Sequence, residues 1–414
     1  MTEPVHIHTY DNGLVLVAEP MDWLESAAFC FLLPAGCAYE PAERAGLGAM
    51  TCEMTQRGAG ERDSREFIQA LENLGVERGE SVSVSHTSYS GALLSDNLAA
   101  TLEIYSDLLR RPLLPGDQLD AGRQVALQEL RAVEDDPGHK VMIELRQRFY
   151  PSPWGRASQG SLDGLEATSM DEIGEFFQQN YRPNGTILSV AGRFDWSELQ
   201  QHVGRLLGDW QAAQGQEIVE GPAGPRIEHV PYESNQTQIG IAFPSVPFAH
   251  KDYFQSWGAV GVLSSGSSSR LFTEVREKRG LCYSVYGTNH TVGKLGSVIC
   301  YAGTSADRAQ ETLDVMIGEL IRLADGVEEE ELGRLKARIK SALIMQQESS
   351  GSRSASIARD WYHLGRVRSF DEISRLVDEL TCDTINAYLA EHPPADFTIV
   401  TLGPSALEIP REIS

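Results

Sequence analysis

The sequence repeats one pattern of elements twice, and this repeat limits the possible fold more than any other feature. An apolar run that ends in proline lies near the start of each half, at residues 29–34 and again at 239–244. A strand-like run that ends in glycine lies near the end of each half, at 186–192 and 397–403. Because both pairs are separated by about 210 residues, the 414-residue chain is predicted to contain two homologous domains.

The segment between the two halves has the composition of a linker. Residues 212–226 read AAQGQEIVEGPAGPR, which is rich in Gly, Pro and Gln and has no apolar periodicity. We assign residues 1–211 to an N-terminal domain, 212–228 to the linker and 229–414 to a C-terminal domain. Within each domain strands and helices arrive in groups, which predicts an α+β fold with a mainly antiparallel sheet covered by helices on one face.

Local signals predict where the main elements lie. A capping box is predicted at Asp63 and Glu66 and another at Ser169, each at the start of a helix. Apolar residues alternate over 81–94, which predicts one strand. Helical periodicity or stop signals predict further helices at 45–57, 64–74, 98–109, 117–133, 306–323 and 328–347.

Composition and charge exclude several classes of function. A formal net charge of −24 argues against a nucleic-acid-binding surface. No apolar run reaches the roughly 18 residues of a membrane-spanning helix, and residues 1–20 show no signal-peptide pattern. None of the six cysteines forms a C-x-x-C pair, so we interpret them as buried free thiols of a reducing compartment. We expect a cytoplasmic protein that binds neither nucleic acid nor membrane.

The most specific motif runs from Arg270 to Tyr286 and reads RLFTEVREKRGLCYSVY. It resembles the signature of the second domain of pitrilysin/insulinase-type zinc peptidases, a family that includes the mitochondrial processing peptidase. The resemblance implies that Arg276 and Tyr283 bind the substrate. A guanidinium and a phenol hydroxyl can stabilise negative charge on a peptide carbonyl under attack. The alternative interpretation is a surface arginine on a helix and a core tyrosine on a strand.

The first half resembles the same family but departs from it at the metal site. Residues 33–40 (LPAGCAYE) resemble the strand and turn that lead into the family's H-x-x-E-H motif. In that motif two histidines bind Zn²⁺ and the glutamate is the general base. This chain has Ala49, Cys52 and Glu53 at those three positions. Residues 125–130 (VALQEL) resemble the segment that supplies the family's third zinc ligand, and Glu129 is retained there.

The remaining donors are poorly suited to a metal ion. Glu53 and Glu129 could in principle hold one together with Cys52, but adjacent helix positions point about 100° apart. No histidine remains nearby in the sequence, and Gly122 stands where the family has a further glutamate. We therefore expect no bound metal and no catalytic residue in this chain.

The resemblance covers nearly the whole chain and implies a half-length subunit. In the family, two half-length subunits form a pair, in which one chain carries zinc and the other supplies the arginine and tyrosine. We therefore expect a non-catalytic, substrate-binding subunit that forms a heterodimer with a homologous zinc-bearing subunit and acts on peptides. Zinc would lie only in the partner, and the chain would be inactive alone. The alternatives are a partnerless pseudoenzyme with a structural or peptide-binding role, and a homodimer when the chain is expressed alone.

Overall fold

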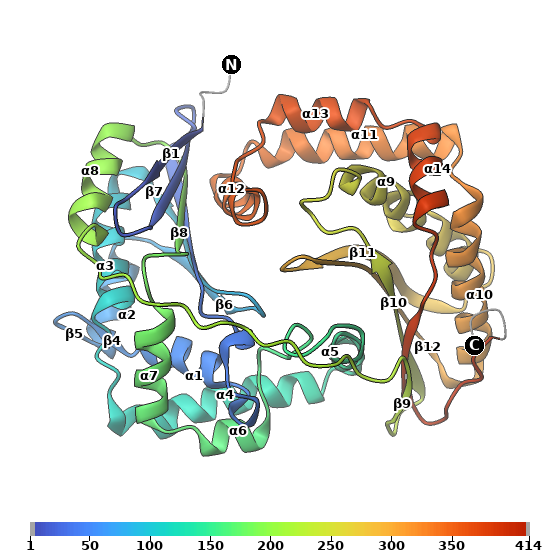
Figure 1. Cartoon of the computed structure of the whole chain (residues 1–414), viewed down its shortest axis with the longest axis horizontal. Coiled ribbons are helices and arrows are strands. Elements are labelled where there is room, and N and C mark those ends of the chain that lie inside the picture. The colour runs from blue at the N-terminus through green and yellow to red at the C-terminus, as the bar shows by residue number, and fades with distance from the viewer. Residues whose placement is uncertain (1–4, 411–414) are drawn as a thin grey trace. The chain divides into compact units, whose positions relative to one another are not determined.

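The chain folds into two compact units, neither of which is contiguous in the sequence (Figure 1). The computed structural model describes residues 5–410, so the outermost residues of the two predicted domains lie outside the described residues. One of the three passages of the main chain from unit 1 to unit 2 follows Val219, inside the predicted linker, and the linear division at 212–228 stays a prediction. Unit 1 comprises residues 1–132, 156–219 and 344–369, and unit 2 comprises 133–155, 220–343 and 370–414.

Unit 1 is built on a six-stranded sheet in the order β1-β2-β8-β3-β7-β6. Only the pair of β2 with β8 is parallel, and the other neighbours are antiparallel, as predicted. Strand β6 therefore lies at one edge of the sheet. The strands are β1 (His6–Thr9), β2 (Val15–Pro20), β3 (Ser26–Leu33), β6 (Glu77–Val82), β7 (Thr87–Leu94) and β8 (Ile187–Gly192).

Unit 2 is built on a five-stranded sheet in the order β11-β12-β10-β13-β9. Again one pair, β13 with β9, is parallel and the rest are antiparallel. The two sheets thus share the mainly antiparallel character that the repeat predicts, and the α+β fold class is confirmed. The strands are β9 (Ile227–Pro231), β10 (Gln236–Ser245), β11 (Cys282–Val292), β12 (Leu295–Ser305) and β13 (Thr398–Gly403).

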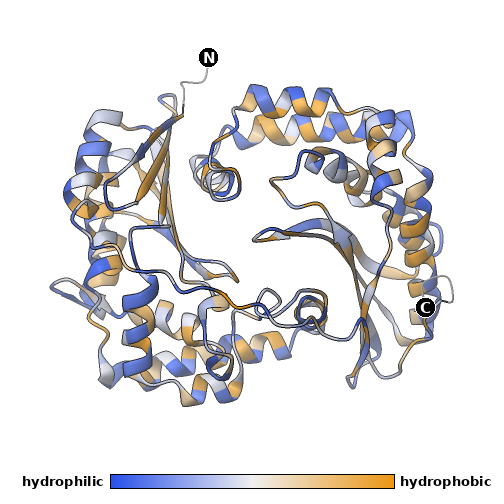
Figure 2. Ribbon diagram, viewed as in Figure 1, coloured by the Kyte–Doolittle hydropathy of each residue, from blue (hydrophilic) through white to orange (hydrophobic). Residues whose placement is uncertain are grey.

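Helices cover one face of each sheet and enclose a separate core in each unit. In unit 1, Leu16, Phe29 and Phe31 of the sheet pack against helical residues such as Leu102. The helices carry one hydrophobic and one hydrophilic face (Figure 2), which is the pattern of helices that cover a sheet. Unit 1 contains α1 (Leu47–Thr55), α2 (Ser64–Asn73), α3 (Leu98–Arg110), α4 (Leu119–Glu134), α6 (Leu162–Ala167), α7 (Met170–Asn180) and α8 (Trp196–Leu207). Unit 2 contains α9 (Tyr253–Ser264), α10 (Ala309–Arg322), α11 (Glu329–Gln346), α13 (Phe370–Asp378) and α14 (Cys382–Glu391).

Two helices are exchanged between the sequence halves, and each covers the second face of a sheet. Helix α12 (Ser350–Leu364) comes from the C-terminal half but packs on β2, β3 and β8 of unit 1 (Figure 1). Helix α5 (Pro137–Phe149) comes from the N-terminal half but packs on β10 and β13 of unit 2. The prediction that helices cover only one face is therefore wrong. An amphipathic pattern does not reveal which sheet its apolar stripe meets.

The predicted capping boxes are confirmed, but one predicted strand is wrong. Asp63 caps α2 and Ser169 caps α7, each with a glutamate at the third helical position. The alternating segment 81–94 forms the end of β6 and all of β7, joined by a tight turn in which the Ser83 amide donates to the His86 carbonyl (2.8 Å). The alternation continues through the turn, so periodicity alone cannot detect it.

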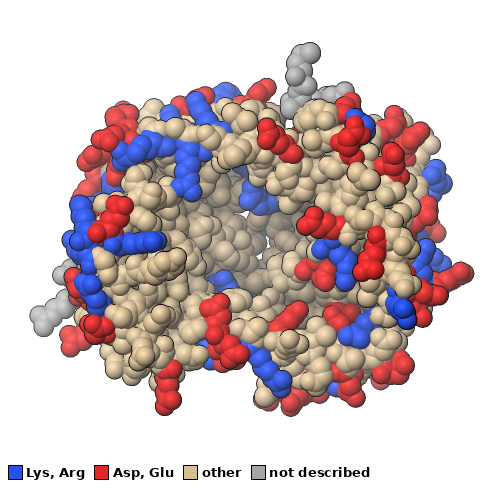
Figure 3. All heavy atoms as spheres, turned by 180° about the vertical axis from the view of Figure 1, so that it is seen from behind, with Lys and Arg blue, Asp and Glu red and all other residues tan. Residues whose placement is uncertain are grey.

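The described residues show a surface of mixed charge (Figure 3) and cysteines that form no disulfide bond. On the face that Figure 3 presents, acidic and basic side chains are interspersed over each unit. All six cysteines are free, and four of them are buried, whereas Cys282 and Cys382 are half-buried. Among residues 5–410, no helix is both long enough and apolar enough to cross a membrane.

Candidate functional site

A buried carboxylate fixes the start of the helix that carries the degenerate motif. Helix α1 begins after Gly46, whose φ of 107° favours glycine. Both carboxylate oxygens of Glu40 accept hydrogen bonds there, from the amides of Gly46 (2.9 Å) and Gly48 (2.7 Å). A Cβ at Gly48 would lie 2.9 Å from the Glu40 Oε1 atom, so the close approach requires glycine. Burial raises the pKa of Glu40 to about 7, against the effect of the two amides.

The first two motif positions offer no usable donor. Ala49 has no donor atom, and Cys52 is buried at 5 % exposure on the core side of α1. Burial raises the pKa of the Cys52 thiol to about 12, so the thiolate that metals bind does not form at neutral pH. Its neighbours are the hydroxyls of Thr55, Tyr89 and Tyr181, which are linked in a chain with O···O distances of 2.8 Å.

The third motif position is already ion-paired. The Glu53 Oε1 atom accepts from Nη2 (2.6 Å) and Nε (3.0 Å) of Arg57, one turn further along α1. Gly122 of α4 faces the same pair. A Cβ at Gly122 would lie 2.9 Å from the Met54 sulfur, 3.3 Å from Arg57 Nε and 3.5 Å from Glu53 Cγ. The arginine and the methionine thus occupy the space into which a longer residue 122 would extend.

The structure does bring Glu129 near Glu53, together with a third carboxylate that the sequence did not single out. Burial raises the pKa of Glu129, and the negative charges of Glu53 and Glu80 raise it further. Glu80 lies on the edge strand β6. In the described part of the chain, however, no three His, Cys, Asp or Glu side chains are placed to hold a metal ion.

These residues do not fit the zinc that the resembling family carries. Zinc is held in proteins by thiolates, imidazoles and carboxylates arranged as a tetrahedron. Here Ala49 has no ligand atom, the Cys52 thiol is protonated, and Glu53 is bound to Arg57. That the chain carries no metal and no catalytic residue stays a prediction.

The buried Glu40 predicts a pH-dependent contribution to stability. Its pKa is about 7 in the folded chain and 4.5 ordinarily, so its contribution is complete below pH 4.5 and is lost as the pH rises through 7. We subtract the unfolding free energy of Glu40→Gln from that of the wild type. This difference is expected to fall by about 2 kcal/mol between pH 5 and pH 8. Urea unfolding at each pH measures this difference.

The same comparison needs a control, because other groups titrate in this range. Burial lowers the pKa of His86 and His363 to about 4, so their contribution is complete above pH 6.5 and is lost as the pH falls. The difference between the unfolding free energies of two chains that both contain the histidines cancels the histidine contribution. Glu43→Gln, at an exposed carboxylate nearby, is the control, and an equal pH dependence in both variants would contradict the assignment to Glu40.

The second candidate group, Arg276 and Tyr283, lies in unit 2. Arg276 is on a π-helical turn, η5 (Phe272–Glu277), and Tyr283 is near the start of β11. Gly280, with a φ of 58°, reverses the chain between them. The Arg276 guanidinium carbon lies 4.9 Å from the centre of the Tyr283 ring. The predicted pair is therefore in contact, although its role in substrate binding stays a prediction.

Tyr283 is 83 % exposed, so it is not a core tyrosine. The alternative interpretation of this residue is therefore wrong. The Arg276 guanidinium also lies 4.8 Å from the centre of the Phe272 ring. Phe272 belongs to the motif at 270–286, and the resemblance implies no role for it. Its spacing of four residues from Arg276 on a helix was the available signal.

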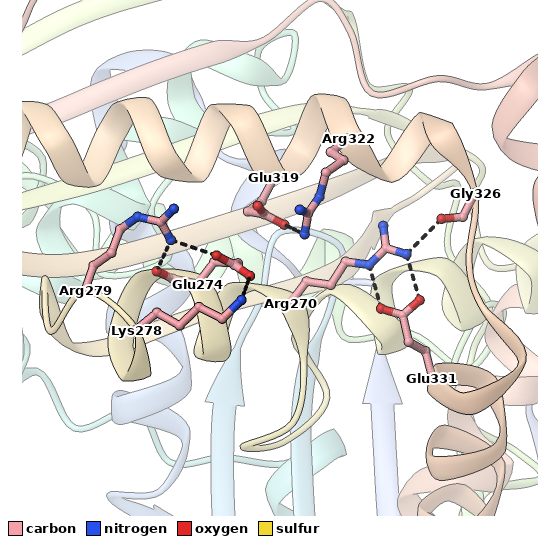
Figure 4. A network of polar contacts seen from close by, with 8 residues as sticks. All are labelled: Arg270, Glu274, Lys278, Arg279, Glu319, Arg322, Gly326 and Glu331. Carbon is pink, nitrogen blue, oxygen red and sulfur yellow. Dashed lines mark hydrogen bonds and ion pairs between the residues drawn. The ribbon is translucent and has the colours of Figure 1, made fainter.

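A network of ion pairs holds the segment around this pair (Figure 4). The buried carboxylate of Glu274 accepts from Lys278 Nζ (2.6 Å) and Arg279 Nη1 (2.7 Å). These contacts lower the pKa of Glu274. Arg270 is bound by both carboxylate oxygens of Glu331, at 2.7 Å each. Arg270, just before the π-helical turn, is thus tied to α11, and Glu274 within the turn is tied to the residues that lead into β11.

The fold and the two motifs together define a peptidase-like protein with an altered metal site. Residues 22–152 match the family described as Insulinase (Peptidase family M16), and residues 168–339 match the Peptidase M16 inactive domain. The chain belongs to peptidase family M16.

Relatives of similar length include proteins named as uncharacterized zinc proteases. One from Rickettsia felis is 24 % identical over 93 % of this chain and 94 % of its own length. Another from Mycobacterium tuberculosis is 26 % identical over 98 % of this chain and 95 % of its own.

Solved structures with the same fold cover almost the whole chain. The peptidase M16 inactive domain from Pseudomonas fluorescens is 20 % identical, with a TM-score of 0.89 over 99 % of this chain and 100 % of its own. A chain of Complex III2 from Candida albicans is 16 % identical, with a TM-score of 0.82 over 97 % of this chain and 96 % of its own.

Proposed function

We propose that this chain is a non-catalytic, substrate-binding subunit that acts in the cytoplasm with a homologous zinc-bearing subunit in an M16-type peptidase. The proposal rests on the side chains at the three zinc-motif positions of α1. These positions hold an alanine, a protonated buried thiol and a carboxylate bound to Arg57. The Arg276–Tyr283 pair, in contrast, is intact. A chain with this pair and without metal ligands on α1 can take part in peptide hydrolysis where another chain supplies the metal.

The chemistry of the pair suits a peptide substrate. The guanidinium donates hydrogen bonds in one plane and the phenol donates one more, so together they can bind a peptide carbonyl. Negative charge that develops on this oxygen during hydrolysis would strengthen both interactions. The relatives named zinc proteases support a peptidase context for the complex.

Purification and reconstitution test this proposal. The isolated chain is expected to contain less than stoichiometric zinc by elemental analysis and to leave quenched fluorescent peptides uncut. Addition of the zinc-bearing homologue should give activity. Tyr283→Phe should then lower kcat/KM by about 10²-fold, because one donor to the developing oxyanion is lost.

The matched control is Tyr286→Phe. Tyr286 is a half-exposed tyrosine on the same strand, and its ring is tilted against that of Tyr301 with ring centres 5.2 Å apart. We expect this variant to keep full activity. Peptide cleavage and stoichiometric zinc in the isolated chain would refute the proposal, as would a fully active Tyr283→Phe complex.

A structural role without a peptidase partner is the second candidate. The observation that favours it is the likeness in fold to a chain of Complex III2 from Candida albicans. Affinity purification of the tagged chain from its native cells separates the two functions. A zinc-containing homologue in the purified material supports the first, and a stable assembly that contains no such homologue supports the second.

A further inference from the structure

We propose that Phe272 is a positioning residue that holds the Arg276 guanidinium in a fixed plane against Tyr283. The inference rests on the proposed substrate-binding role of Arg276 and Tyr283. It adds a third residue to that pair and explains how an arginine can stay available for a ligand.

The two rings hold the guanidinium without using its hydrogen-bond donors. The guanidinium carbon lies 4.8 Å from the Phe272 ring centre and 4.9 Å from the Tyr283 ring centre. A planar guanidinium stacks on aromatic faces through its own face, and its N–H groups point outward in the plane. Within residues 5–410, no carboxylate pairs with Arg276 and no acceptor takes a hydrogen bond from its side chain. The donors therefore remain free for an incoming acceptor.

The π-helical turn sets the register between Phe272 and Arg276. The Lys278 amide donates to the Thr273 carbonyl (2.9 Å), which is a hydrogen bond across five residues. Such turns are rare and occur often at functional sites. At the end of the turn, the Leu281 amide donates to the Val275 carbonyl (3.0 Å) and directs the chain into β11. This local distortion thus brings the rings of Phe272 and Tyr283 to the same guanidinium.

Neighbouring basic side chains bind two of the carboxylates near Arg276, Glu274 and Glu331. Figure 4 shows Glu274 bound by Lys278 and Arg279, and Glu331 bound by Arg270. Every other basic side chain of the segment 270–279 has a carboxylate partner. A carboxylate on Arg276 would compete with the ligand for the same N–H groups, whereas aromatic rings do not. The arrangement suits an oxygen acceptor such as the backbone carbonyl of an extended peptide.

Nuclear magnetic resonance tests the position of the guanidinium in the intact, isolated chain. The Nε–Hε signal of Arg276 is assigned by its loss in Arg276→Lys, and two flanking rings should shift it upfield. Phe272→Leu is expected to remove part of this upfield shift, and Phe272→Tyr to retain it. Phe254→Leu is the matched control, because Phe254 contacts the rings of Tyr253 and Trp257 of the same unit edge to face. An Arg276 signal that is unchanged in Phe272→Leu would overturn the proposal.

Kinetics of the reconstituted complex separate this inference from the proposed function. Phe272→Leu should lower kcat/KM about two- to fivefold, as expected for the loss of one exposed cation–π contact, and Phe272→Tyr should restore it. Activity of Phe272→Leu equal to that of Phe254→Leu would overturn the positioning role in a complex where Tyr283→Phe is impaired. If Tyr283→Phe and Arg276→Lys are both fully active while the signal of Arg276 still moves in Phe272→Leu, the proposed function fails and the positioning of the guanidinium stands.

Discussion

Replacing Arg353 with methionine should destabilise unit 1 by about 3–5 kcal/mol, because it leaves a buried carboxylate without a counter-charge. Arg353 lies in the first turn of α12 and is 5 % exposed, and Glu19 on β2 is 6 % exposed. Arg353 Nε lies 3.2 Å and 3.1 Å from the two carboxylate oxygens of Glu19, and Nη2 donates to the second of them. The urea midpoint of the unit 1 transition measures the loss.

Two further variants establish that the unpaired charge is the cause. Glu19→Gln combined with Arg353→Met removes both charges and should recover most of the lost stability, since an uncharged buried pair carries no desolvation penalty. Arg193→Met removes an arginine of unit 1 whose pair with Glu25 is exposed, and should change stability by less than about 0.5 kcal/mol. An Arg353→Met midpoint as close to wild type as that of Arg193→Met would contradict the prediction.

Expression of the two sequence halves as separate chains should give neither half in a native state. A fragment of residues 1–215 lacks α12, so Val17 and Ile187, which are buried under Ile357 of that helix, become exposed. A fragment of residues 216–414 lacks α5, which buries Val400 and Leu402. Exposed apolar faces of this kind favour aggregation. Circular dichroism and size-exclusion chromatography of each fragment and of the coexpressed pair measure the outcome.

The coexpressed fragments should assemble, because each supplies the helix that the other lacks. The control is the second fragment with Arg353→Met, which should assemble less well because the contact with Glu19 is lost. A half that is monomeric, soluble and cooperatively folded on its own would show that the exchanged helices are dispensable. That result would also favour the linear domain division at 212–228.

The fold class and most elements could be predicted because they depend on local signals. Strand composition, capping residues such as Asp63, and glycines at helix ends act within a few residues, and the structure bears them out. The exchange of α5 and α12 could not be predicted. The exchange depends on which sheet packs against the apolar side of each helix. The helix and that sheet lie far apart in the sequence, so local periodicity does not connect them. The turn at Ser83–His86 was missed because alternation has the same period on both of its sides.

The candidate site was predictable where a motif fixed the chemistry and not where packing did. The motif was sufficient to single out Arg276, Tyr283 and the missing ligands of α1. The ion pair of Glu53 with Arg57 was visible as a spacing of four residues on a helix. The stacking of Phe272 depends on a π-helical register, and the approach of Glu80 depends on the position of an edge strand. The four-residue spacing of Phe272 and Arg276 does not reveal the π-helical register, and no sequence pattern places Glu80 beside Glu129.

Gly122 and Arg57 determine how this chain would accommodate a complete zinc motif. Glu53→His would leave Arg57 without its carboxylate, and a glutamate at 122 would lie against the sulfur of Met54 and the Arg57 guanidinium. A complete motif would therefore require coordinated changes at residues 53, 54, 57 and 122 rather than substitutions at the ligand positions alone.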